Sequence, residues 1–232
     1  MNGITIIPVT GLPEIQPGLI LAEVLAGAAA FQDGDVLVVT QKIVSKAEGR
    51  LEAVDPKDPL AHKALVEREA VRVLRRRGDL LITETAHGFV CANAGVDLSN
   101  VHEGWAALLP VDPDRSARRI RDGLRARTGL SVGVIISDTF GRTWRQGVTD
   151  VAIGCAGVAA VIDLRGTADA MGRELQVTEV CVADEIASAA ELVMGKSSGV
   201  PVAIVRGIDA SWLREGSVAG EITRPPAEDL FR

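Results

Sequence analysis

The segment Ser131–Ser137 constrains the fold more than any other, because it is the most apolar run in the chain and is dense enough to form a buried strand. Other short apolar runs, each ended by Gly, Pro or polar residues, also match the pattern of strands. These are Ile4–Val9, Asp35–Thr40, Asp79–Thr83, Gly88–Cys91, Val158–Asp163, Glu174–Val182 and Pro201–Val205. The chain is therefore predicted to contain at least one sheet with a buried centre.

Four segments between these runs have helical patterns. They are Gly18–Phe31, Pro59–Arg77, a segment that starts at Asp112-Pro113, and Asp184–Met194. Asp112 is a favoured N-cap residue and Pro113 is a favoured first-turn residue, so this helix start is well defined. Because helices and strands do not alternate strictly, we predict an α+β or mixed α/β fold with a mixed sheet, and not a doubly wound Rossmann fold.

Composition excludes several classes of partner. Hydrophobic residues make up 47% of the 232 residues but aromatic residues only 3%, so the core must consist of Val, Ile, Leu and Ala. The formal net charge of −6 argues against nucleic acid as a partner, since nucleic-acid binders present a basic surface. The first residues lack the pattern of a signal peptide, and no apolar run is long enough to span a membrane. We expect a cytoplasmic protein with no membrane association.

Well-known nucleotide and hydrolase motifs are absent from the sequence, so any catalytic site must be built from carboxylates and cations. The first acidic segment is Asn93–Asn100, in which small residues predict tight turns around Asp97. Oxygen-bearing side chains on a tight loop suit Mg²⁺ or Mn²⁺. The alternative is an Asx turn in which Asp97 caps its own backbone.

The second acidic segment, Ser137–Gly147, follows the most apolar strand directly. Asp138 and Thr139 are candidates for binding a cation, and Arg142 and Arg145 are candidates for binding an anionic substrate. The alternative is that Asp138 caps a helix or a turn and that both arginines are ordinary surface charges. Trp144, in the same segment, either packs over a ligand ring or, as most Trp side chains do, is buried for structural reasons.

A third segment, Gln41–Arg50, contains two of the five Lys residues of the chain, Lys42 and Lys46. An ammonium group after a strand can contact phosphate oxygens, although a solvated loop lysine is the common alternative. Acids for a metal ion together with several cations indicate phosphoryl-transfer chemistry on a small anionic substrate. The residues alone identify neither the nucleotide nor the acceptor.

Read as an ordered set, these segments resemble one family, the coenzyme F420-0:L-glutamate ligases, also called γ-glutamyl ligases. The resemblance covers essentially the whole chain. The matching stretches are Gly11–Ile15, Asp33–Asp35, Val44–Arg50, His87–Asp97, Ser137–Arg142, Asp163–Gly166, Ala183–Glu185 and Glu228–Arg232.

The resemblance implies an acid–amino-acid ligase that uses GTP. In this family GTP phosphorylates the terminal carboxylate of the phospholactyl arm of coenzyme F420-0, and L-glutamate then displaces phosphate to form an amide; γ-linked glutamates can follow. The resemblance also implies two divalent cations, Mg²⁺ or Mn²⁺, with K⁺ as a further cofactor. It implies an α+β fold with two intimately joined subdomains, and an intertwined homodimer.

Carried over by position, the resemblance makes Asp97 and Asp138 ligands of the first metal ion, with Thr139 serving the second. The nucleotide pocket is implied at Leu12, Pro13, Glu14, Ile15, Gln41, Lys46 and Asn100, and at the loop Met194–Pro201. Lys196 departs from the pattern, because it stands where an oxygen-bearing ligand of the second metal ion is expected and a protonated lysine cannot ligate a cation. Either Lys196 contacts phosphate or the second metal ion is held differently. Arg142 and Arg145 remain our candidates for binding the acidic substrate.

We expect residues 1–232 to form a single ligase domain, without the nitroreductase-like domain that follows it in some relatives. Two alternatives to the GTP-dependent F420-0 ligase stay open at this stage. One is a related amide ligase with another acid acceptor, and the other is a catalytically idle binding module that keeps the fold.

Overall fold

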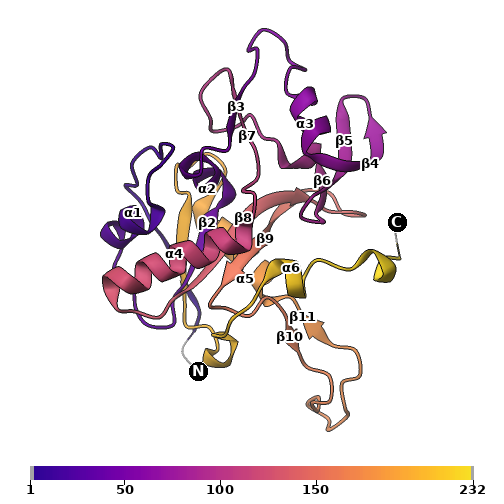
Figure 1. Ribbon diagram of the computed structural model, residues 1–232. Helices are drawn as coiled ribbons and strands as arrows, with labels where there is room; N and C mark the ends of the chain where they lie inside the picture. The colour runs from indigo at the N-terminus through magenta and orange to yellow at the C-terminus, as the bar shows by residue number, and fades with distance from the viewer. Residues whose placement is uncertain (1–2, 231–232) are drawn as a thin grey trace.

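A mixed five-stranded sheet forms the centre of the protein in the computed structural model, which describes residues 3–230 (Figure 1). Phe231 and Arg232, the end of the last matching stretch, lie outside the described residues. The strand order is β1 (Thr5–Pro8), β12 (Val202–Arg206), β2 (Val36–Thr40), β8 (Gly133–Gly141) and β9 (Val148–Ala156). Only β2 and β8 are parallel to each other in this sheet. The predicted α+β class and mixed sheet are confirmed.

Helices cover both faces of this sheet. The strand β2 reads Val-Leu-Val-Val, and its side chains alternate between two separate cores. Leu37 and Val39 pack with α1 (Leu21–Ala28) and α4 (Pro113–Thr128). Val36 and Val38 pack with α5 (Val182–Met194) and with α6 (Val218–Glu221). The central strands are therefore buried on both sides, which explains their nearly continuous apolar sequences.

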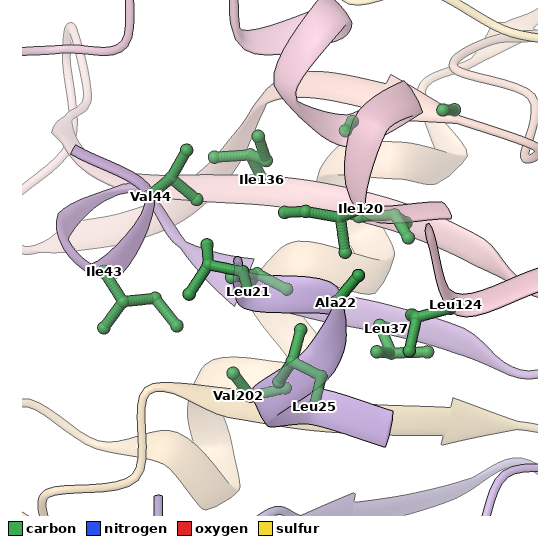
Figure 2. Close-up of a cluster of buried hydrophobic side chains, with 14 of the residues drawn as sticks. Leu21, Ala22, Leu25, Leu37, Ile43, Val44, Ile120, Leu124, Ile136 and Val202 are labelled. Atoms are coloured by element: carbon green, nitrogen blue, oxygen red, sulfur yellow. The ribbon is translucent and has the colours of Figure 1, made fainter. Parts of the chain in front are cut away.

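The core is aliphatic, as the composition predicts. Figure 2 shows the cluster between α1, α4 and the sheet, where Leu25, Leu37, Ile120 and Leu124 come together. No aromatic side chain is among the buried core residues of the described chain. The helix α4 begins as predicted, since the Asp112 carboxylate accepts a hydrogen bond from the Arg115 N–H at 2.8 Å.

Shorter elements lie beside the central sheet. A three-stranded sheet contains β4 (Ala70–Arg77), β5 (Leu80–Thr85) and β6 (Val90–Ala92), and a two-stranded sheet contains β3 (Leu51–Ala53) and β7 (Trp105–Ala107). They share a small core with α3 (Lys63–Glu69) that includes Val66 and Leu81. A further hairpin of β10 (Ile162–Asp163) and β11 (Glu179–Val180) extends away from the sheet (Figure 1). The remaining elements are α2 (Gln41–Ala47) and the short helices η1 (Asn93–Gly95), η2 (Ala210–Trp212) and η3 (Pro226–Glu228).

Several predicted elements are wrong or incomplete. The predicted helix Pro59–Arg77 is helical only over Lys63–Glu69 and continues as the strand β4, because pairing with β5 satisfies its backbone. Of the predicted strands Val158–Asp163 and Glu174–Val182, only two residues each belong to a strand, and Glu174 forms an isolated bridge with Ala168. The strand β9 and the helix α2 were not predicted. Within residues 3–230, no helix combines the length and the apolar character needed to cross a bilayer.

Candidate active site

A cavity of about 920 Å³ opens at the carboxyl ends of the parallel strands β2 and β8. Thr40, the last residue of β2, pairs with Ser137 of β8, so the residues that follow these two positions reach the same edge of the sheet. Gln41 and Lys42 follow on α2, and Asp138 and Thr139 follow on β8. Three loops complete the wall, and they contribute Leu12, Pro13, Glu14, Ile15, Asp97, Ser99, Asn100, Gly195, Lys196 and Pro201.

Asp97 faces the cavity from the loop before β7 and has several partners. Its Oδ1 accepts a hydrogen bond from the Ser99 N–H at 2.7 Å, so the predicted Asx turn is present. Its Oδ2 lies 2.7 Å from Lys42 Nζ, which also donates to Ser99 Oγ. Burial opposes ionisation of Asp97, but the ammonium of Lys42 and the hydrogen bonds from Ser99 hold its pKa below the usual value. The turn thus presents an ionised carboxylate to the cavity.

Asp138 lies on β8 and is not a turn cap, so the alternative interpretation of this residue is wrong. No side-chain donor within the described residues forms a hydrogen bond with its carboxylate; the backbone N–H of Thr139 is the donor that lowers its pKa. Burial raises the pKa of Asp138 to about 7, and the negative charges of Asp97 and Asp150 add to that rise. The Asp138 carboxylate therefore has no ion-pair partner among the described residues to offset the cost of its ionisation.

A second group of polar residues lies around Lys196, at the end of α5. Lys196 Nζ is 2.6 Å from Asp150 Oδ1, 2.9 Å from Glu191 Oε1 and 2.5 Å from Thr139 Oγ1. The Thr139 hydroxyl in turn donates to Asp150 Oδ1 at 2.7 Å. Burial disfavours the charged form of Lys196, but Asp150 and Glu191 outweigh it and raise the pKa of this ammonium. The group is a hydrogen-bonded ion cluster that carries its own cation.

Two further residues of α2 point to ligand binding. Lys46 Nζ lies 2.5 Å from Glu14 Oε1 and ties the loop before α1 to the cavity. Gln41 is buried, and its Oε1 accepts a hydrogen bond from Ser45 Oγ at 2.9 Å. The Nε2 of the same amide is buried and has no hydrogen-bond partner among residues 3–230. An unsatisfied donor in a cavity wall is expected to pair with a ligand.

The turn between β8 and β9 is exposed. Arg142 and Arg145 are on this turn and do not line the cavity; Arg142 Nη2 donates to the Gln146 carbonyl at 2.9 Å. The Trp144 side chain is 88% exposed, so the expected burial of this residue is wrong. Binding of a substrate by these three residues stays a prediction.

Sequence reasoning missed two acidic residues of the cavity, Asp150 and Glu191, which both contact Lys196, and it did not predict the contacts of Lys42 with Asp97 and Ser99. Lys42 was noted as a candidate cation, but its pairing with Asp97 spans 55 positions of sequence. Asp150 was missed because β9 was missed. Its signal is a single acidic residue at the start of the segment 148–156, which is otherwise mainly apolar.

Residues 11–207 match the family model described as F420-0:gamma-glutamyl ligase. The chain belongs to this family. Every residue that lines the cavity, from Leu12 to Pro201, falls inside the matched segment.

Curated relatives extend the match to the whole chain. A coenzyme F420:L-glutamate ligase of Methanopyrus kandleri is 44% identical to this chain, and the alignment covers 100% of both proteins. The proteins of the same name from Methanothermobacter thermautotrophicus and Archaeoglobus fulgidus are each 42% identical over 99% of this chain, and the alignments cover 99% and 96% of those proteins. Membership of the gamma-glutamyl ligase family makes this protein an enzyme that forms carbon–nitrogen bonds.

The cavity contains carboxylate oxygens, which are ligands that divalent cations such as Mg²⁺ prefer. Among residues 3–230, no three acidic, His or Cys side chains are arranged to hold a metal ion on their own. Asp97 and Asp138 nevertheless offer oxygen donors in the manner of Mg²⁺ sites, which use one or two carboxylates and take their remaining ligands from water and substrate phosphates. Around Thr139, by contrast, the ammonium of Lys196 already occupies the oxygens that a second cation would need.

Proposed function

We propose that this gamma-glutamyl ligase joins L-glutamate to the phospholactyl carboxylate of coenzyme F420-0 with GTP as the energy source, and then adds γ-linked glutamates. Several relatives carry the name coenzyme F420:L-glutamate ligase, which supports the choice of substrates. The observation that carries the proposal is the convergence of Asp97, Asp138 and Lys42 in one cavity. Paired carboxylates beside an ammonium are suited to hold and orient polyphosphate.

The reaction requires an activated acceptor because a carboxylate is a poor electrophile. Transfer of the terminal phosphoryl group of GTP to the acceptor carboxylate gives an acyl phosphate and GDP. The amine of L-glutamate then attacks the carbonyl carbon, so that a carbon–nitrogen bond forms while the carbon–oxygen bond to phosphate breaks. The amine loses a proton to solvent, and phosphate leaves.

Residues of the cavity have distinct tasks in this proposal. Asp97 and Asp138 would hold a divalent cation, Mg²⁺ or Mn²⁺, which would neutralise charge on the phosphates. Lys42 and Lys46 add protein-borne positive charge on the same side, from successive turns of α2. The free Nε2 donor of Gln41 is available to an acceptor atom of the nucleotide. Leu12, Pro13, Glu14, Ile15 and Asn100 form the surrounding wall.

The acidic acceptor is proposed to reach the cavity along the β8–β9 turn. Arg142 and Arg145 on this turn carry fixed positive charge, and guanidinium groups pair well with carboxylates and phosphates. Trp144 exposes its ring beside them, where it is available to a flat aromatic system. The turn leads directly into Thr139 and Val148, which line the cavity.

We further propose that the enzyme is a homodimer. The strand β4 is an edge strand of its sheet and exposes Val71 and Val73. The β10–β11 hairpin exposes Met171 and Val177. Unpaired edges with exposed apolar side chains are typical of surfaces that another chain covers. Light scattering after size-exclusion chromatography tests this proposal, and a monomer at micromolar concentration would contradict it.

The central test is a direct assay with the purified protein, coenzyme F420-0, L-glutamate, GTP and MnCl₂. Mass spectrometry is expected to show acceptor products heavier by whole glutamyl units, together with GDP. Asp97→Asn and Asp138→Asn should lower turnover at least about a hundredfold while the fold is kept, and Asp79→Asn, an exposed acid outside the cavity, serves as the matched control. Absence of product with each of several divalent metals and nucleotides would refute the proposal. GDP release with a different acid would instead identify a ligase for another acceptor.

A further inference from the structure

Lys196, in the ion cluster at the end of α5, has more partners than a simple surface ion pair. Lys196 Nζ has three N–H donors, and three oxygens take them, from Thr139, Asp150 and Glu191. These acceptors come from β8, β9 and α5, so the ammonium joins three elements at the cavity wall. A divalent cation is held by oxygen ligands gathered from separate elements in the same way.

The partners of Lys196 require a permanent positive charge. The Asp150 side chain is only 3% exposed and that of Glu191 is 20% exposed. A buried carboxylate without a counter-charge is strongly destabilising, so some cation must accompany Asp150. Because Lys196 is part of the chain, it supplies that charge at any concentration of metal ion.

A charge count for the whole cavity points the same way. Its wall carries five carboxylates, from Glu14, Asp97, Asp138, Asp150 and Glu191, against three ammonium groups, from Lys42, Lys46 and Lys196. When all five carboxyl groups are ionised, as metal binding requires of Asp138, the excess of two negative charges matches one divalent cation. A second divalent cation would leave the empty cavity with a net positive charge and would have to displace Lys196 from all three of its acceptors.

We propose that Lys196 is a built-in cation that takes the place of a second metal ion, so that this enzyme binds a single divalent cation in each active site. The inference rests on the proposed metal site at Asp97 and Asp138. It also predicts which change would create a second site: loss of the ammonium at position 196 would leave Thr139, Asp150 and Glu191 as an open, anionic set of oxygen ligands.

The test measures Mn²⁺ bound per chain, without turnover. The wild-type enzyme and the variants Lys196→Gln, Lys196→Arg and Lys57→Gln are titrated with MnCl₂ in the presence of GDP, and free Mn²⁺ is followed by electron paramagnetic resonance. Lys57 is exposed and outside the cavity, so its variant is the matched control for loss of a lysine charge. Thermal melting of each protein verifies that it is folded.

The expected result is an increment of about one Mn²⁺ per chain in Lys196→Gln over the wild type. Lys196→Arg keeps the positive charge and should show no increment, and neither should Lys57→Gln. A merely structural role for Lys196 would change the melting temperature and leave the Mn²⁺ count unchanged. Equal counts in the wild type and Lys196→Gln, or two Mn²⁺ ions in the wild type, would overturn the inference. Failure of the proposed function can be distinguished from failure of this inference. It appears as absence of ligated product in the activity assay, whatever the increment in bound Mn²⁺.

Discussion

Asp97 and Asp138 face one cavity from different elements, and the negative charge of Asp97 adds to burial in raising the pKa of Asp138 to about 7. Lys42 accompanies Asp97 directly at 2.7 Å, whereas Asp138 forms no ion pair with another described residue. The two carboxylates therefore differ in protonation near neutral pH before any ligand binds. This asymmetry is the part of the site that is easiest to test.

The first prediction concerns the pH dependence of stability without metal. The folded-state pKa of Asp138 is raised from 3.8 to about 7. The contribution of the protonated Asp138 carboxyl to the unfolding free energy is therefore fully present below pH 3.8 and is lost as the pH rises through 7. Relative to Asp138→Asn, we expect the wild type to lose about 2 kcal/mol of unfolding free energy between pH 4 and pH 7.5. Urea denaturation in EDTA at several pH values measures this difference. Parallel curves for the two proteins would contradict it, and Asp79→Asn should track the wild type.

The second prediction concerns Lys42 as a competitor for the metal ion. Its ammonium is bound to the Asp97 oxygen that a cation would need. Lys42→Met should therefore strengthen Mn²⁺ binding without nucleotide by about tenfold, which corresponds to about 1.4 kcal/mol. The same variant should weaken GDP binding, because a phosphate loses a positive partner. Calorimetry with each ligand alone separates the two effects, and Lys57→Met is the control; weaker Mn²⁺ binding would show that Lys42 does not compete.

The sequence contained enough information for the sheet centre but not for the elements around it. Ala70 and Leu74 are the two inward residues of β4, and their spacing of four fits one helical turn as well as a strand. Pairing with β5 decides between these structures, and that pairing depends on residues 80–85. The helix α2 has only seven residues, and Thr40 at its N-cap makes no capping hydrogen bond with its side chain, so the local signal for this helix is weak.

The same reasoning explains which site residues could be predicted. Asp97, Asp138 and Lys46 stand in long stretches that carry the family resemblance. Asp150 was missed together with β9, and without Asp150 the role of Lys196 has no explanation. Lys196 contacts Asp150 across 46 positions of sequence, so only the folded chain shows that its charge is already neutralised. Arg142 and Arg145 were predicted from proximity in sequence to Asp138, but the β8–β9 turn carries them beyond the cavity wall.

The third prediction concerns the buried amide of Gln41. Since its Nε2 has no partner in the described structure, replacing the amide by an apolar side chain removes an unsatisfied group. Gln41→Leu should leave the unfolding free energy unchanged or raise it by up to about 1 kcal/mol, because the Leu108 carbonyl, which lies 2.6 Å from Ser45 Oγ, can then accept the single hydroxyl hydrogen of Ser45. GDP affinity should fall about tenfold if the nucleotide takes the free donor. Unchanged GDP affinity would contradict this assignment; Gln176→Leu, on the exposed hairpin, is the control.

The last prediction concerns Asp114, a buried carboxylate far from any proposed chemistry. Its Oδ1 accepts hydrogen bonds from the Cys155 N–H at 2.8 Å and the Val218 N–H at 3.0 Å, and its Oδ2 accepts from Ser217 Oγ at 2.8 Å. It therefore fastens the first turn of α4 to β9 and α6. Asp114→Ala would leave buried donors unpaired and should lower the unfolding free energy by about 3 kcal/mol.

The control for Asp114→Ala is Asp122→Ala, on the exposed face of the same helix, which should change the unfolding free energy by less than about 0.5 kcal/mol. Chemical denaturation measures both variants. Asp114 holds the opposite end of β9 from Asp150, so the Mn²⁺ affinity of the folded Asp114→Ala protein should match that of the wild type. A large loss of metal affinity would show instead that the position of β9 is set by α4 along its whole length, including the part that carries Asp150 into the cavity.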